Sequence, residues 1–292
     1  MLQDFIFVFV AGLITALATG LGAVPFFFVE EFGDRWNVAL WGIASGIMVS
    51  ASLFGLINEG LAYVAGGLPT LMVGGLLAGV VLVEVSDRVL DGTDVGGRSE
   101  ADADTNNADI DESTQSLDTP IDVEAFAEGD PKKLVLILGI LTVHSFPEGV
   151  AVGVSFAELG FDGGIGILGL SVPVLAVFMT IAISIHNVPE GTAIAIPMRA
   201  MGLSKWRMVG AAVFSSLPQP IGAVIAFAFV RWAEAFLPFG FGFAAGAMIY
   251  LVLTEFIPEA LETGVNLPRS GYRELSVGIG AGVLLMVPLL FV

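Results

Sequence analysis

Long apolar stretches separated by short polar breaks dominate the pattern of hydrophobic and polar positions along the chain. A helix needs roughly 20 residues to cross a hydrocarbon core of about 30 Å, and eight stretches reach or nearly reach that length. They cover residues 5–28, 38–57, 62–85, 133–157, 165–197, 207–230, 236–258 and 274–292. The pattern therefore predicts an all-α integral membrane protein with eight transmembrane helices.

One strongly polar segment interrupts this pattern. Residues 91–130 contain thirteen of the 29 acidic residues and a single basic residue, Arg98. Low hydrophobicity with high net charge is typical of a disordered segment. The predicted organisation is three transmembrane helices in residues 1–90, an acidic disordered loop in 91–132, helices four and five in 133–197, and helices six to eight in 198–292.

The positions of lysine and arginine predict the orientation in the membrane. With eight spans, both termini lie on one side, and ten of the eleven basic residues fall in loops on the opposite side. Only Arg231 falls on the side of the termini. Because cytoplasmic loops are enriched in lysine and arginine, we expect both termini to be extracellular and the acidic loop to be cytoplasmic.

Composition supports the membrane class and narrows the chemistry. The mean hydropathy of +0.88 and the 55% of hydrophobic residues exclude an ordinary soluble domain. The chain has no cysteine, which excludes disulfides, thiolate metal sites and cysteine nucleophiles. The net charge of -18 and the scarcity of lysine suggest a halophilic host. We expect a multi-pass protein of the cell membrane and no nucleic-acid partner.

A weak internal repeat relates two of the predicted spans. Residues 46–61 and 246–261 are identical at six of sixteen positions, at a constant offset of 200. These segments belong to the second and seventh spans, which cross in opposite directions, and inverted repeats build midplane sites in many carriers. Glu59 and Glu259 would then be mirror-related acids at opposite mouths of one path. Chance similarity between apolar helices is the alternative.

The chain has only two histidines, and both lie in copies of one hexapeptide, His-Ser-Phe-Pro-Glu-Gly at 144–149 and His-Asn-Val-Pro-Glu-Gly at 186–191. Residues four apart share a helix face, so each copy presents an imidazole and a carboxylate on one side. Each proline also leaves a helical carbonyl without its usual donor. Such groups are tolerated in membrane helices where neighbours, water or ions satisfy them.

The two hexapeptides place four ionisable groups at mid-membrane depth, on spans that are consecutive and therefore antiparallel. A central charged residue costs about 2.5–3.5 kcal/mol on insertion scales, which favours a function over simple packing. Imidazole and carboxylate ligands together suit Zn²⁺ and also Fe²⁺, Mn²⁺, Co²⁺ or Cd²⁺. We therefore predict a divalent transition metal as the transported substrate, with no resident cofactor.

These residues resemble the ZIP (Zrt/Irt-like) metal transporters, especially the prokaryotic GufA-like branch. The resemblance rests on the paired His-x-x-Pro-Glu-Gly motif, supported by Ala-Gly-Ala-Met-Ile-Tyr at 245–250 and Glu-Phe-Ile-Pro-Glu-Ala at 255–260. It implies a 3+2+3 inverted-repeat arrangement with spans four and five between two three-helix halves. It also implies metal transport toward the cytosol, by alternating access and commonly as a homodimer.

The resemblance also assigns the site residues. The primary metal site is expected to contain His144, Glu148, His186 and Glu190. Relatives often have stronger ligands at Ser145, Asn187 and Gln219, so we hypothesise that a second ion binds weakly or not at all and that these three residues are polar lining. Glu255 resembles the acid near the inner exit, and Glu259 joins it on the inner side as the repeat counterpart of Glu59. Ser52 and Glu59 are expected on the outer side of the path, and a packing face of small residues is the alternative for these two positions.

Three other interpretations remain open at this point. A metal-selective channel would use the same ligands, and a metal sensor or structural protein would bind without transport. A membrane-embedded zinc protease would need a glutamate beside the first histidine as general base, whereas Ser145 and Asn187 occupy those positions. We therefore expect a transporter and not an enzyme.

Overall fold

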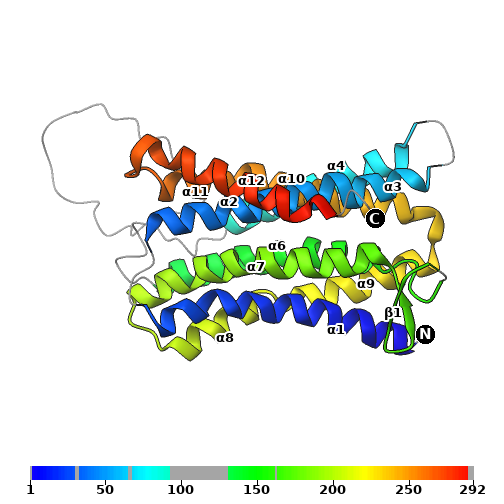
Figure 1. Cartoon of the computed structure of the whole chain (residues 1–292), viewed down its shortest axis with the longest axis horizontal. Coiled ribbons are helices and arrows are strands. Elements are labelled where there is room, and N and C mark those ends of the chain that lie inside the picture. The colour runs from blue at the N-terminus through cyan, green and yellow to red at the C-terminus, as the bar shows by residue number, and fades with distance from the viewer. Residues whose placement is uncertain (1, 30–32, 65–67, 93–130, 162, 289–292) are drawn as a thin grey trace, which may run out of the picture.

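A computed structural model describes residues 2–29, 33–64, 68–92, 131–161 and 163–288 of the chain. Helices account for most of these residues (Figure 1). The predicted acidic disordered loop falls almost wholly within residues 93–130, which lie outside the described residues, so its disorder stays a prediction.

The first half of the chain forms long helices with local changes of winding. Helix α1 (Leu2–Thr19) continues into the 3-10 segment η1 (Gly20–Phe27), and helix α2 (Asp34–Ser50) continues through the π segment η2 (Ala51–Ile57) into α3 (Asn58–Ala62). Helices α4 (Thr70–Gly92) and α6 (Pro131–Ser155) follow.

The second half of the chain also forms helices that are joined by 3-10 and π segments. The helices are α7 (Val174–Ala200), α8 (Lys205–Ser215), α9 (Pro218–Trp232), α10 (Leu237–Leu251), α11 (Ile257–Thr263) and α12 (Tyr272–Met286). The π segment η5 (Val252–Phe256) joins α10 to α11, and the short 3-10 segments η4 (Glu234–Phe236) and η6 (Pro268–Gly271) precede α10 and α12.

Six helical segments among the described residues are long and apolar enough to cross a membrane: Leu2–Phe27, Asp34–Ala62, Thr70–Val89, Val174–Ala200, Lys205–Trp232 and Glu234–Thr263. Helices α6 and α12 add further helical segments of 25 and 15 residues. These segments confirm the predicted class, a helical multi-pass membrane protein.

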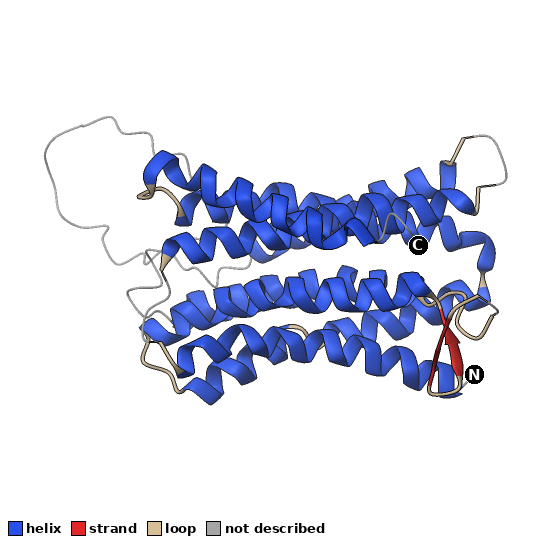
Figure 2. Ribbon diagram, viewed as in Figure 1, coloured by secondary structure: helices blue, strands red, loops and turns tan. Residues whose placement is uncertain are grey.

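The predicted start of the fifth span is wrong, because residues 165–172 form a β-hairpin outside the helix. Strand β1 (Ile165–Ile167) pairs antiparallel with β2 (Leu170–Val172). The two turn residues have positive φ, 50° at Leu168 and 82° at Gly169, as a tight hairpin turn requires. Helix α7 begins only after Pro173, and the hairpin is a small exception to the all-α prediction (Figure 2).

The helices form two layers (Figure 1). One layer contains α1, α6, α7, α8 and α9, and the other contains α2, α4, α10 and α12. Helix α6 contacts α4 and α10, and α7 contacts α2, so the two motif-bearing helices line the interface between the layers. The hairpin lies at the end of the molecule where the chain starts (Figure 2).

Helix pairs in the second layer pack through glycines that follow the offset of 200. A side chain at Gly42 or Gly46 of α2 would overlap the backbone of α12, and one at Gly242 or Gly246 of α10 would overlap the backbone of α4. The π segments η2 and η5 also begin at positions 51 and 252. The pair α2 and α12 therefore corresponds to the pair α10 and α4, in agreement with the internal repeat.

Candidate metal site

The glycine that ends each hexapeptide sets how closely the motif helices approach their neighbours. A side chain at Gly149 of α6 would overlap the backbone of Gln219 at the start of α9, and one at Gly191 of α7 would overlap the carbonyl of Thr19 at the end of α1. The adjacent residues, Glu148 and Glu190, are thereby held in the tightly packed interior of the first layer, where each is 1% exposed.

Glu148, His186 and Glu190 form one group of possible metal ligands. One ligand atom from each residue lies within 4.8 Å of the others. His186 Nε2 lies 3.0 Å from Glu148 Oε1, and the His186 ring stacks on Phe256, with ring centroids 5.2 Å apart. All three ligands are buried, so solvent does not reach this group in the conformation described.

The two carboxylates of this group favour the binding of a cation. Both carboxylate oxygens of Glu190 are buried and have no hydrogen-bond partner among the described residues, and the same holds for Nδ1 of His186. Within the described part of the chain, no lysine or arginine pairs with Glu148 or Glu190. Because an unpaired buried carboxylate is costly, a bound cation would satisfy atoms that the protein leaves unsatisfied.

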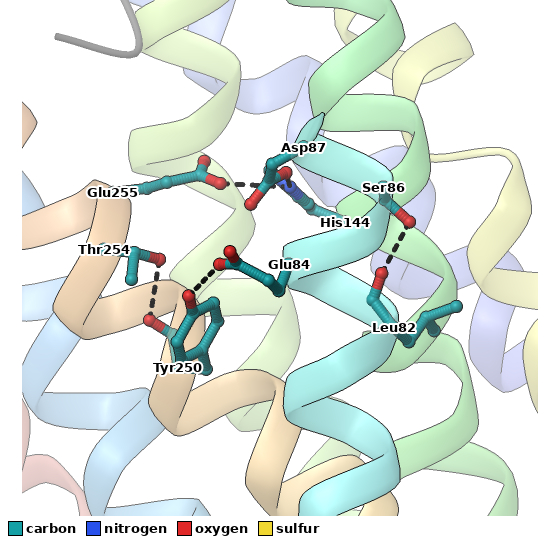
Figure 3. Close-up of polar contacts among 8 residues, drawn as sticks. All are labelled: Leu82, Glu84, Ser86, Asp87, His144, Tyr250, Thr254 and Glu255. Carbon is teal, nitrogen blue, oxygen red and sulfur yellow. Dashed lines mark hydrogen bonds and ion pairs between the residues drawn. The ribbon is translucent and has the colours of Figure 1, made fainter. Parts of the chain in front are cut away.

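A second ligand group lies between the two layers and contains Asp87, His144 and Glu255 (Figure 3). His144 Nε2 is 2.9 Å from Asp87 Oδ1 on α4 and 3.1 Å from Glu255 Oε1 on η5. The His144 side chain is 2% exposed, whereas that of Asp87 is 26% exposed. This group therefore joins the buried interior to the molecular surface.

The structure distributes the four predicted primary ligands between the two groups. Glu148, His186 and Glu190 lie together, whereas Nε2 of His144 faces Asp87 and Glu255. His144 Nδ1 is buried and has no hydrogen-bond partner in the part of the chain that the structure describes. Binding of a single ion by all four predicted ligands thus stays a prediction.

Two of the three predicted lining residues, Asn187 and Gln219, are linked to the first group by hydrogen bonds. Ser145, Asn187 and Gln219 are all completely buried. The Gln219 amide nitrogen donates to Glu148 Oε2 at 2.5 Å, and the Asn187 amide nitrogen donates to Gln219 Oε1 at 3.0 Å. Gln219 therefore contacts Glu148 directly, whereas Asn187 reaches this ligand group only through Gln219.

The predicted outer residues lie toward the hairpin end. Glu59 of α3 lines a pocket of about 330 Å³ together with Asn58, Glu158, Pro173 and the start of α7. Ser52 of η2 is fully buried, and its hydroxyl has no partner. The position of Glu59 in a pocket agrees with a mouth on this side.

The predicted inner residues differ in their relation to the ligands. Glu255 is 8% exposed and belongs directly to the second ligand group. Glu259 lies one turn further along, on α11, and is half-buried. The structure thus places Glu255 in a ligand group and leaves Glu259 outside both groups.

Sequence reasoning missed Asp87 as a ligand. Asp87 follows the apolar stretch expected at 62–85, and α4 extends to Gly92, which brings this carboxylate onto a helix beside α6. The same helix bears Glu84, which accepts a hydrogen bond from Tyr250 of α10 and pairs with Arg88 (Figure 3). The available signal was the charged residues at the end of the apolar run, because Asp87 and Arg88 follow Glu84 by three and four residues and so share its helix face.

Long apolar helices with buried histidine and carboxylate side chains define the class, a polytopic membrane protein with groups that could hold a metal ion. The model of the ZIP zinc transporter family matches residues 5–289. The chain belongs to this family.

Three relatives illustrate the range of similarity. A protein of Arabidopsis thaliana is 37% identical over 251 residues, which are 86% of this chain and 34% of its own length. The zinc transporter GufA of Myxococcus xanthus is 36% identical over 155 residues, 53% of this chain and 54% of its own. The zinc transporter ZupT of Corynebacterium aurimucosum is 28% identical over 276 residues, 90% of each chain. The matched segment thus spans between about a third and a half of the first two relatives.

Proposed function

We propose that this protein transports divalent transition metal ions, with Zn²⁺ as the first candidate, across the cell membrane into the cytosol. The observation that supports this most strongly is the buried group of Glu148, His186 and Glu190, with both Glu190 oxygens unpartnered. The names of GufA and ZupT as zinc transporters point to the same substrate class.

The ligand types support a transition metal. Zn²⁺ binds histidine nitrogen and carboxylate oxygen at about 2.0–2.2 Å, and both types are present in each ligand group. Fe²⁺, Mn²⁺, Co²⁺ and Cd²⁺ accept the same ligands, whereas Ca²⁺ and Mg²⁺ prefer oxygen alone. The metal is the transported substrate and not a cofactor of a reaction.

The proposed topology has eight spans in a 3+2+3 arrangement, with α6 and α7 between two inverted three-helix halves and both termini outside the cell. The matching glycine contacts of α2 and α10 and the two π segments support the inverted repeat. The bias of lysine and arginine toward one side supports the orientation. We also propose a prokaryotic plasma membrane, a halophilic host and assembly as a homodimer.

The proposed path begins at the Glu59 pocket, passes Ser52 and reaches the group of Glu148, His186 and Glu190. The ion then moves to Asp87, His144 and Glu255, where the partial exposure of Asp87 gives access to the cytosol, with Glu259 near the exit. His144 is one turn from Glu148 on α6. His144 can therefore bind the ion together with Glu148 before the ion passes to Glu255.

The burial of the first group favours a carrier over the alternative, a metal-selective channel. A channel needs a continuous path that an ion can enter and leave quickly, whereas the described conformation closes Glu148, His186 and Glu190 from solvent. A carrier exposes such a site to each side in turn. The protease alternative is disfavoured because neither histidine has an adjacent glutamate.

Metal uptake into proteoliposomes tests the proposal. We expect the purified protein to load Zn²⁺ into vesicles with saturation and a steep temperature dependence, and other divalent metals to compete. Uptake no greater than that of empty vesicles would contradict a transport function. Flux that rises linearly with concentration and depends weakly on temperature would support the channel.

A further inference from the structure

We propose that Thr15, Asn187 and Gln219 form a hydrogen-bonded chain, here called the amide chain, that positions Glu148 so that a single oxygen of this carboxylate binds the transported ion. The inference rests on the proposed metal-transport function. It assigns Asn187 and Gln219 as positioning residues rather than metal ligands.

The backbone carbonyl of Thr15 fixes the direction of the amide chain. A carbonyl oxygen is an acceptor only, so the Asn187 atom 2.8 Å from it must be the amide nitrogen. That nitrogen has two hydrogens, and the second is donated to the Gln219 side chain at 3.0 Å. The atom of Gln219 that faces Asn187 is therefore its oxygen.

The same logic determines what Glu148 meets. Because the oxygen of Gln219 faces Asn187, its amide nitrogen faces Glu148, and it lies 2.5 Å from Oε2. The opposite oxygen, Oε1, lies 3.0 Å from Nε2 of His186. One oxygen of Glu148 is thus directed toward the ligand group, and the other is occupied by a hydrogen bond from a neutral donor.

Burial makes the amide chain rigid. Asn187 and Gln219 are fully buried, and Glu148 is 1% exposed, so water does not compete for these hydrogen bonds. Hydrogen bonds to an ionised group are about twice as strong as neutral ones. The amide chain therefore stabilises the negative charge of Glu148 without a second cation.

Two consequences follow for metal binding. Glu148 binds the ion through Oε1, and Oε2 is not free to bridge to another ion. Groups that hydrogen-bond to a metal ligand typically change metal affinity by about 10–100-fold when they are removed. We therefore expect the amide chain to set the affinity of the site although its two amide nitrogens are occupied by hydrogen bonds within the protein.

A double-mutant cycle tests whether the two amides act in series. The chain has only two histidines, so ¹⁵N-histidine labelling gives one set of resonances for each of them. Titration of the labelled protein in nanodiscs with Cd²⁺ then measures metal binding to the first ligand group as a change in the His186 resonance. We expect Asn187→Leu and Gln219→Met each to weaken Cd²⁺ binding about tenfold, and the double variant to weaken it by the same factor because one break already disables the chain. Asn37→Leu removes a buried asparagine of α2 and serves as the control with unchanged affinity.

Several outcomes would overturn the amide chain. A loss of about a hundredfold in the double variant would show that the two residues act independently. An unchanged affinity in Asn187→Leu would show that Gln219 needs no orienting partner. An equal loss in the Asn37→Leu control would attribute the effect to general destabilisation. None of these readings requires transport, so failure of uptake in vesicles would be distinguished from failure of this proposal.

A second variant tests the direction of the chain. Aspartate at position 187 has no donor for the Thr15 carbonyl or for Gln219, and it adds a third carboxylate to the buried region that already contains Glu148 and Glu190. We expect Asn187→Asp to retain one more Cd²⁺ per protomer than the parent at neutral pH, as measured by mass spectrometry of the metal after desalting. An ion count equal to that of the parent would overturn the proposed direction.

Discussion

The clearest structural prediction concerns Gly191, which ends the second hexapeptide. A Cβ at this position would overlap the backbone carbonyl oxygen of Thr19 and would lie 3.3 Å from the Cα of Gly22. A backbone carbonyl cannot rotate away as a side chain can. Helix α7 must therefore move away from α1 in a Gly191→Ala variant, and Glu190 must move with it.

The expected magnitude combines two opposing effects. Overpacking of a tight interior costs about 1–3 kcal/mol, and backbone overlap favours the upper part of that range. Replacing glycine by alanine within a helix returns about 1 kcal/mol. The net loss of stability is therefore about 2 kcal/mol, equivalent to a fall of roughly 4 °C in the melting temperature.

A matched control is available in Gly210, because a Cβ there would meet nothing within 4 Å. Gly210 is an exposed residue in helix α8, so Gly210→Ala keeps the gain in helix propensity without the overlap. Thermal unfolding in one detergent should separate the two variants, with Gly191→Ala below the parent and Gly210→Ala equal to it or above it. Equal melting temperatures for the two variants would refute the argument from close packing.

Two further predictions concern the connections between the layers. Tyr63 donates a hydrogen bond to Glu158 at 2.6 Å, and burial followed by this bond raises the pKa of the Tyr63 hydroxyl, which keeps it protonated as a donor. Tyr63→Phe should increase the labelling rate of a cysteine introduced at Asn58 in the Glu59 pocket by up to about fivefold, the equivalent of about 1 kcal/mol. Glu158→Gln retains an acceptor and should change the rate less, and equal rates in the two variants would contradict this. Asp87→Asn should abolish the response of the His144 resonance to Cd²⁺ while the His186 response persists, and a simultaneous loss of both responses would indicate a single shared site.

The helical framework could be predicted from the sequence because apolar length alone determines which segments fit a membrane. The hairpin at 165–172 was missed because its alternation is hidden in a run of apolar residues, although Gly166 and Gly169 were a turn signal. The π segments were not predictable, since their winding depends on packing between helices rather than on residue type.

The ligand types were predictable and their grouping was not. The spacing of four residues correctly places His144 and Glu148 one turn apart on α6, but it cannot tell that the imidazole faces α4 and η5 while the carboxylate faces α7. Asp87 was missed because its helix extends beyond the apolar run. The Thr15 carbonyl has no sequence signal at all, because any residue at that position offers the same backbone group.

The proposed transport requires the ion to bind the buried group of Glu148, His186 and Glu190. This requirement is tested by the initial rate of Zn²⁺ uptake into proteoliposomes that contain equal amounts of the parent or of the Glu190→Gln variant. Glu234→Gln, which changes an exposed glutamate, is the matched control. We expect Glu190→Gln to reduce uptake to the level of empty vesicles, because it removes the carboxylate whose two oxygens have no partner among the described residues. Glu234→Gln should transport like the parent. Uptake by Glu190→Gln at the parental rate would contradict this requirement.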